Sequence, residues 1–131
     1  MRFLIEAHHP ADVHFWKFAI VELKERGHEH LFLSRDRDVM RRLLERYPFI
    51  NAKTISAAGG GNRFPMGEFL QRQWGVFKNV LSYRPDVVAS CMGSYTQTAG
   101  LLGKPNLIFT DSEFQHFNHK IAHPFATAIY T

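Results

Sequence analysis

Two short polar loops follow two apolar runs near the end of the chain. The runs 87–90 and 106–109 are rich in Val, Ile and Phe, as is typical of strands covered on both faces. Small, hydroxyl-bearing or acidic residues follow at once: Gly93, Ser94 and Tyr95 after the first run, Asp111 and Glu113 after the second. Parallel strands end at one edge of a sheet, where such sheets bind ligands, so we expect these loops to line one cleft.

Each loop has a chemical and a structural interpretation, and the sequence leaves both open. Gly93 and Ser94 can open a helix whose free N–H groups bind a phosphate or sugar oxygen, or Ser94 can simply cap that helix. Asp111 and Glu113 can orient sugar hydroxyls and exchange protons with them, or they can cap the next helix. We take Gly93, Ser94, Tyr95 and Asp111 as candidate substrate contacts and Glu113 as a candidate acid or base.

A third polar loop follows the first apolar run of the chain, 2–7, and contains His9, Asp12 and His14. Asp12 precedes an apolar helix, so its carboxylate either accepts a bond from a free backbone N–H or takes a proton from an acceptor hydroxyl, and both roles can coexist. His14 is either a surface histidine at the helix start or a group that faces the cleft. We expect Asp12 and His14 as catalytic residues and His9 as a substrate contact.

Other clusters are better explained by structure than by chemistry. The glycines 59–61 lack the Gly-Lys-Ser/Thr ending of a phosphate loop. His116, His119 and His123 share one stripe of a helix but have no fourth ligand, so we predict no metal site. Acidic residues interleave with the arginines of 35–46, which indicates a solvated helix face and no nucleic-acid partner. We also expect no cofactor.

Composition limits the class of protein. The 131 residues, of which 45% are hydrophobic, suffice for one compact domain. A single cysteine, Cys91, excludes internal disulfides, and neither a secretory signal nor a run of about 20 apolar residues is present. A cytoplasmic protein is expected. The net charge of +4 gives a mild preference for anionic partners.

Strand-like and helix-like segments alternate along the chain. We expect strands at 2–7, 28–34, 51–55, 87–90, 106–109 and 128–131, and helices at 14–26, 38–47, 66–83, 94–102 and 113–125. This alternation predicts an α/β, Rossmann-like, doubly wound fold, with a mainly parallel sheet and helices on both faces. Thr131 follows directly on a strand, where such a sheet normally continues, so we expect residues 1–131 to be one domain of a two-domain protein.

Two segments carry a resemblance to known families. The run GSYTQTAGLLGKPNLIFTDSEFQHFNHKIAHPFATAIYT, 93–131, resembles the N-terminal domain of the UDP-N-acetylglucosamine transferases that complete the lipid-linked peptidoglycan precursor. The run HHPADVHFWKFAIVELKERGHEHLFLSRD, 8–36, resembles uncharacterised prokaryotic proteins that are predicted to be glycosyltransferase-like, and His14 matches the second histidine of their first loop. Both belong to the GT-B glycosyltransferases.

The resemblance implies a function for the cleft. In GT-B enzymes the N-terminal domain generally takes the acceptor, while a C-terminal domain, absent from this chain, holds the nucleotide sugar. It implies metal-independent transfer of a sugar to a hydroxyl acceptor, either a sugar or a lipid-linked compound, and contact of the helix 66–83 with the inner face of the membrane. The alternatives are a non-catalytic binding or assembly module and a sugar-nucleotide 2-epimerase. Epimerases prefer His-Gly-Asp where this chain has Met92, Gly93 and Ser94.

Two further expectations follow from a half-protein. A GT-B active site is built from two facing domains, so the chain alone should transfer no sugar and bind nucleotide sugars weakly. Its uncovered apolar surface should also favour self-association into a homo-oligomer.

Overall fold

A single parallel sheet forms the centre of the molecule. The computed structural model describes residues 1–36, 38–57, 65–91, 96–110, 120 and 122–130. Within them the strands are β1 (Arg2–Glu6), β2 (Glu29–Asp36), β3 (Ala52–Ala57), β4 (Val87–Ser90), β5 (Asn106–Phe109) and β6 (Ala128–Tyr130). They pair in parallel in the order β3-β2-β1-β4-β5-β6. The predicted Rossmann-like sheet is confirmed.

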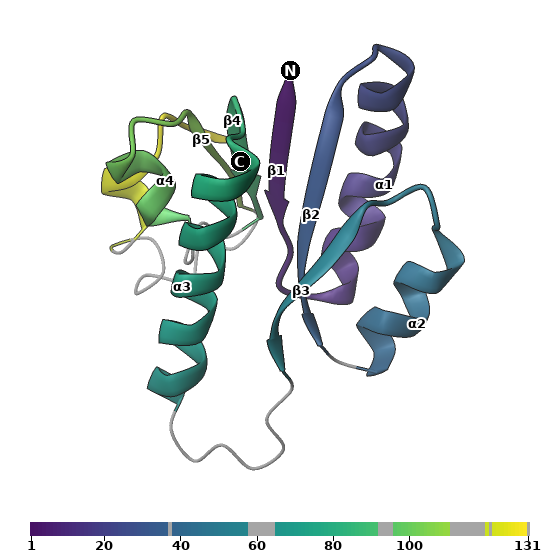
Figure 1. Ribbon diagram of the computed structural model, residues 1–131, viewed down its shortest axis with the longest axis horizontal. Coiled ribbons are helices and arrows are strands. Elements are labelled where there is room, and N and C mark those ends of the chain that lie inside the picture. The colour runs from purple at the N-terminus through teal and green to yellow at the C-terminus, as the bar shows by residue number, and fades with distance from the viewer. Residues whose placement is uncertain (37, 58–64, 92–95, 111–119, 121, 131) are drawn as a thin grey trace.

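Helices cover both faces of this sheet. They are α1 (Pro10–Glu25), α2 (Asp38–Arg46), α3 (Pro65–Tyr83), the short α4 (Gln97–Leu101) and the 3-10 helix η1 (His123–Phe125). α1 and α2 lie on one side of the sheet, and α3 and α4 lie on the other (Figure 1). The doubly wound arrangement expected from the alternating pattern is therefore present.

The two faces have separate apolar cores because successive strand side chains point to opposite sides. Ile5 and Phe32 pack with Val13, Trp16 and Ile20 of α1, whereas the neighbouring Leu4, Leu31 and Leu33 pack with residues of α3. The central strands are thus covered on both faces, which explains why their sequences are almost continuously apolar.

The first helix begins four residues earlier than predicted, at Pro10 instead of His14. Proline suits the first turn of a helix, where its missing N–H has no partner to lose. Asp12 and His14 therefore both lie inside α1, and the expectation that Asp12 precedes the helix is wrong. His9 is the residue at the N-cap.

The helix between β4 and β5 begins later than predicted. Thr96 is its N-cap and Gln97 its first residue, whereas the sequence predicts a start at 94. Ser94 itself lies outside the described residues. Thr96 is fully buried, and its carbonyl accepts a hydrogen bond from Asn106 Nδ2 at 3.2 Å, which fixes this end against β5. Gly103, with φ of 74°, ends the helix as predicted.

Most other boundaries agree with the sequence to within two residues. β4 and β5 match the prediction, α2 and α3 each differ from it by one residue, and β2 and β3 each run two residues further. The predicted helix 113–125 lies largely outside the described residues, and its described end is the 3-10 helix η1.

Candidate functional site

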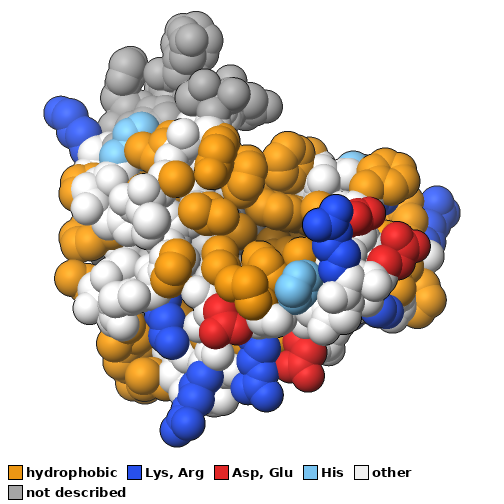
Figure 2. Space-filling model, turned by 90° about the horizontal axis from the view of Figure 1, so that it is seen from above, with side chains coloured by type: hydrophobic (Ala, Val, Ile, Leu, Met, Phe, Trp, Pro, Cys, Tyr) orange, Lys and Arg blue, Asp and Glu red, His pale blue; other side chains and the backbone are white. Residues whose placement is uncertain are grey.

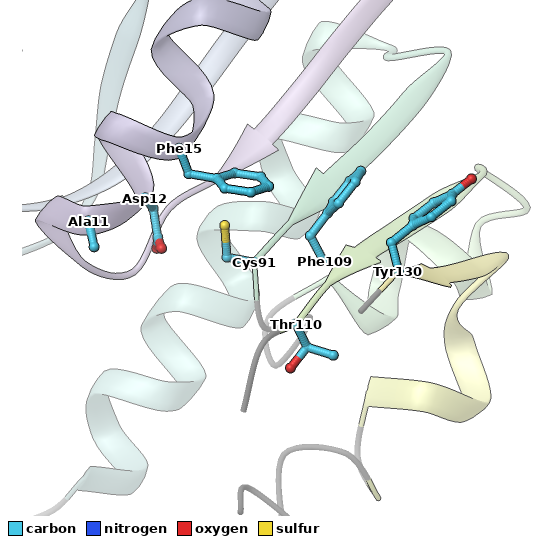
Figure 3. Close-up of a pocket in the computed structure, with 7 residues that line it drawn as sticks. All are labelled: Ala11, Asp12, Phe15, Cys91, Phe109, Thr110 and Tyr130. Atoms are coloured by element: carbon cyan, nitrogen blue, oxygen red, sulfur yellow. The ribbon is translucent and has the colours of Figure 1, made fainter. Parts of the chain in front are cut away.

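A pocket of about 290 Å³ lies at the carboxyl edge of the sheet (Figure 3). Its walls come from the first turns of α1 and from the ends of β4, β5 and β6. The described lining residues are Ala11, Asp12, Phe15, Cys91, Phe109, Thr110 and Tyr130. Elements far apart in sequence thus meet here because their strands are neighbours in the sheet.

The pocket lies at the point where the winding of the sheet reverses. β1 pairs with β2 on one side and with β4 on the other. The connection through α1 leads toward β3, whereas the connection after β4 leads toward β6. The loops that follow β1 and β4 therefore run in opposite directions from neighbouring strand ends, and open α/β sheets bind ligands in the crevice between such loops.

Asp12 links the start of α1 to the loop after β1. Its Oδ2 accepts hydrogen bonds from the backbone N–H groups of His8, at 2.6 Å, and His9, at 2.9 Å. The side chain is largely buried, yet it also lines the pocket. Asp12 therefore satisfies otherwise unpaired backbone donors, as a capping residue does, and places a carboxylate at the pocket wall.

Cys91 follows β4 and lies next to Asp12 in the pocket (Figure 3). Burial raises the pKa of this thiol far above its ordinary value, and the negative charge of Asp12 raises it further. The thiolate is the nucleophilic form of cysteine, so at neutral pH Cys91 is a neutral thiol and a poor nucleophile.

Aromatic rings make up one side of the pocket. Phe109 stacks on Tyr130 with centroids 5.0 Å apart, and Phe15 lies 5.7 Å from Phe109. Trp16, behind them in the core, meets the edge of Phe109 at 5.1 Å. In Figure 3 Phe15, Phe109 and Tyr130 follow one another in a row, with Asp12 and Cys91 at the Phe15 end. The pocket is thus apolar on one side and has its carboxylate at one end.

On the opposite face of the sheet the same edge is closed by a buried ion pair. Glu6 ends β1, and Arg72 of α3 donates to its Oε1 and, at 3.3 Å, to the carbonyl of Ala7. Both side chains are at most 1% exposed. Burial raises the pKa of Glu6, and the Arg72 charge opposes this shift. The pair ties α3 to the strand from which the first loop departs.

The structure brings only some of the predicted site residues to the pocket. Asp12 lines it. His9 is exposed, with its ring 4.5 Å from that of His8. His14 is also exposed and lies near Lys17 and Tyr47, on the side of α1 that meets α2. The remaining candidates lie outside the described residues: Gly93, Ser94, Tyr95, Asp111 and Glu113.

Sequence reasoning missed the aromatic wall. Phe109, Thr110 and Tyr130 end β5 and β6, where the rule that strands end at the binding edge would have found them. Phe15, an apolar residue within the predicted helix 14–26, is 54% exposed and lines the pocket. In this chain hydrophobic residues at strand ends line the pocket together with polar ones.

Exposed hydrophobic side chains also occur beyond the pocket. Leu70, Trp74 and Leu81 of α3 and Phe18 of α1 are each more than half exposed. In the space-filling view a band of hydrophobic side chains crosses the middle of the face shown, and charged side chains lie mostly below and to the right of it (Figure 2). No helix in the described parts of the chain is long and apolar enough to span a membrane. Nor do the described residues contain a group of three or more metal-ligating side chains.

Comparison with known proteins finds similar structures but no matching sequence. No family model and no curated protein sequence matches the chain. Among solved structures, MurG from Acinetobacter baumannii superposes on 98% of the chain with a TM-score of 0.72 at 18% identity. A putative UDP-N-acetylglucosamine 2-epimerase from Listeria monocytogenes superposes on all of it, with a TM-score of 0.69 at 12% identity.

The rhamnosyltransferase SpnG, solved with thymidine diphosphate, matches 95% of the chain with a TM-score of 0.63 at 17% identity. The chain spans 39 to 40% of the length of these three proteins. At such identities the similarity establishes the fold. The expected resemblance to GT-B glycosyltransferases is confirmed at that level, and the epimerases share the same fold.

Proposed function

We propose that this chain is the acceptor-binding half of a glycosyltransferase-like protein. The observation that carries the proposal is the pocket at the reversal point of the sheet. It places the Asp12 carboxylate beside an apolar wall and has no Lys, Arg or His among its described lining residues. Such a pocket suits an uncharged alcohol better than a nucleotide diphosphate, whose phosphates need positive charge or free N–H groups.

The proposed chemistry is transfer of a sugar to a hydroxyl group. The acceptor oxygen forms a bond to the anomeric carbon of the sugar as the bond from that carbon to the nucleotide diphosphate breaks. The leaving diphosphate keeps the electron pair, and the hydroxyl proton passes to a base, for which we propose Asp12. His14 and Glu113 remain proposed acid or base residues, and His9, Gly93, Ser94, Tyr95 and Asp111 remain proposed substrate contacts. The nucleotide sugar would be held mainly by a second domain.

Amide shifts of the ¹⁵N-labelled 131-residue chain test this assignment. We expect UDP-N-acetylglucosamine at concentrations up to about 1 mM, a weak-binding regime, to leave the amides of Cys91, Phe109 and Thr110 unmoved. Neutral alcohols from a panel of methyl glycosides, aliphatic alcohols and phenols should include compounds that shift them. Tight binding of the nucleotide sugar at these amides would refute the assignment to the acceptor side.

A turnover assay with the same chain separates the alternatives. Incubation with UDP-N-acetylglucosamine and the alcohol panel, followed by mass spectrometry and chromatography of the products, should give neither glycoside nor free UDP. Release of N-acetylmannosamine or its nucleotide would instead support the 2-epimerase alternative. If neither the nucleotide sugar nor any alcohol binds at the pocket, a non-catalytic assembly module becomes the better explanation.

We further propose that α3 contacts a membrane surface. Leu70, Trp74 and Leu81 lie on one stripe of this helix and are 52 to 59% exposed, and Lys78 approaches the Trp74 ring at 5.9 Å. Exposed apolar and aromatic side chains beside a basic one are typical of helices that rest on anionic membranes. Co-sedimentation with vesicles of phosphatidylcholine and phosphatidylglycerol tests this. Trp74→Ser should reduce binding, whereas Phe18→Ser on α1, which is also more than half exposed but lies on the opposite side of the sheet, should not.

A further inference from the structure

The pocket residues indicate which kind of acceptor the site takes. We propose that the acceptor carries its hydroxyl on an uncharged, flat aromatic group, and that this group stacks in the pocket formed by Phe15, Phe109 and Tyr130. The inference rests on the proposed function, because it names the substrate class of the acceptor half. It is carried by ring geometry, by charge and by the supply of polar partners.

The ring geometry favours a planar ligand. Three rings from α1, β5 and β6 form a row, and Phe109 and Tyr130 lie nearly parallel, with 18° between their planes. Phe15 and Tyr130 are 54% and 50% exposed, so their faces are not covered by the described parts of the chain. Aromatic side chains gain most from offset-stacked or edge-to-face contacts with another ring. A flat ring system would complete the row.

The charge of the pocket disfavours anionic ligands. Asp12 brings a negative charge, and the described lining residues supply no Lys, Arg or His to balance it. Cys91, held as the neutral thiol, neither attracts nor repels an anion. A phosphate or carboxylate group would therefore lose its hydration without gaining a counter-charge, whereas an uncharged ring would not.

The described lining residues offer few polar side chains for a buried free sugar. Asp12 Oδ2 accepts two backbone N–H groups, and the Cys91 thiol also hydrogen-bonds to the Asp12 side chain. Besides these two residues, only Thr110 and Tyr130 bring a polar side chain to the described lining of the pocket. A sugar ring has several hydroxyls, and each needs a partner when it loses water. A simple aromatic alcohol has a single hydroxyl group. Asp12, at the end of the aromatic row, is placed to receive it (Figure 3).

The size of the pocket fits a small ring system. An apolar cavity of about 150 Å³ holds one benzene molecule. The pocket measures about 290 Å³, so two fused rings can enter. We therefore choose 2-naphthol as the probe, with methyl β-D-glucopyranoside as the sugar of comparable size.

Binding to the ¹⁵N-labelled chain tests the inference directly. We expect 2-naphthol to shift the amides of Cys91, Phe109 and Thr110 in a saturable way, with a Kd in the range of about 0.1 to 1 mM. The glucoside should bind at least tenfold more weakly. Equal or tighter binding of the glucoside, or no saturable shift with 2-naphthol, would overturn the aromatic assignment.

Matched variants show whether the rings are responsible. Phe15→Ala and Tyr130→Ala should each weaken 2-naphthol binding about fivefold to tenfold. Phe18→Ala, one turn further along α1, and Ile129→Ala, which precedes Tyr130 in β6, should leave it unchanged. All four side chains are substantially exposed, so each variant should fold, which the melting temperature checks. Equal loss in the control variants would contradict the inference.

The outcomes distinguish this inference from the proposed function. If the glucoside binds at these amides and 2-naphthol does not, the acceptor assignment stands and the aromatic one fails. If UDP-N-acetylglucosamine displaces 2-naphthol from the pocket, the acceptor assignment fails while the aromatic selectivity of the pocket is retained.

Discussion

At the carboxyl end of β1 the two faces of the sheet differ, although they are the two sides of the same strand. On the α1 side the edge opens into an aromatic pocket, of which the Phe15 and Tyr130 rings are about half exposed. On the α3 side it is closed by the buried pair of Glu6 and Arg72. Because adjacent strand residues point to opposite faces, a single strand can end beside an open pocket on one side and form a buried ion pair with a helix on the other.

The difference suggests a division of roles. Buried ion pairs add little net stability, because desolvation of both charges offsets their attraction, but in some proteins they hold packed elements in one arrangement. Arg72 also donates to the carbonyl of Ala7, which lies in the loop that leads to Asp12. We infer that the polar side holds this loop in place, while the apolar side leaves its surface available to a ligand.

Breaking the polar side should have the largest effect on stability. Arg72→Met leaves Glu6 buried and without its charge partner, so we expect a loss of about 3 to 5 kcal/mol in the free energy of unfolding. Urea denaturation measures it. The control is Arg2→Met, because Arg2 and Glu29 form an exposed ion pair, with side chains 49% and 66% accessible. That change should cost less than about 1 kcal/mol.

Replacing both members of the buried pair sharpens the interpretation. The double variant Glu6→Leu with Arg72→Met removes both charges and keeps apolar volume, so it should be more stable than Arg72→Met alone. If the double variant is as unstable as the single one, packing and not the unpaired charge explains the loss. The ion pair of Glu6 and Arg72 would then have no special electrostatic role.

The first helix should show a smaller effect. Asp12→Ala removes the acceptor of two backbone N–H groups, so we expect a loss of about 1 to 2 kcal/mol in the free energy of unfolding. Asp12→Asn keeps an acceptor oxygen and should lose less. Thermal or urea unfolding compares the two. A loss as large as that of Arg72→Met would contradict the view that the α1 side is the less constrained of the two.

Much of the fold was predictable because its signals are local. Gly27 and Gly103 have φ values of 78° and 74° and end α1 and α4 where the sequence placed the stops. β4 and β5 were placed correctly because short apolar runs between turn residues have few alternatives in an α/β pattern. The start of α1 differs from the prediction because Pro10, a residue that favours the first turn of a helix, follows two polar histidines that are typical of a loop.

The site was less predictable because its contacts are distant in sequence. Arg72 and Glu6 are 66 positions apart, and no periodicity marks Arg72 as buried. The wall made by Phe15, Phe109 and Tyr130 depends on strand order, which brings β6 beside β5 and β5 beside β4. Asp12 was found because a carboxylate after a strand is a strong signal, whereas an aromatic residue in the same position resembles core.

The smallest expected effect concerns Cys91, which reports on the apolar side directly. Burial is the largest cause of the raised pKa of its thiol. Alkylation by iodoacetamide should therefore be slow at neutral pH. The alkylation rate should still increase with pH above the ordinary thiol pKa of 9.0, without reaching a plateau there. In the urea-unfolded chain the alkylation rate should reach half of its maximum near that value.

The same pKa shift determines how the stability of the fold depends on pH. Because the pKa of the Cys91 thiol is higher in the folded than in the unfolded state, its contribution to stability is fully present below 9.0 and decreases as the pH rises above it. Asp12→Asn removes the second cause of the shift but not the first. Its alkylation rate at a given pH should therefore increase by a factor below about ten. A plateau below pH 9 in the folded wild-type chain would mean that Cys91 is more open to water than the pocket geometry indicates, and the apolar character of that side would need revision.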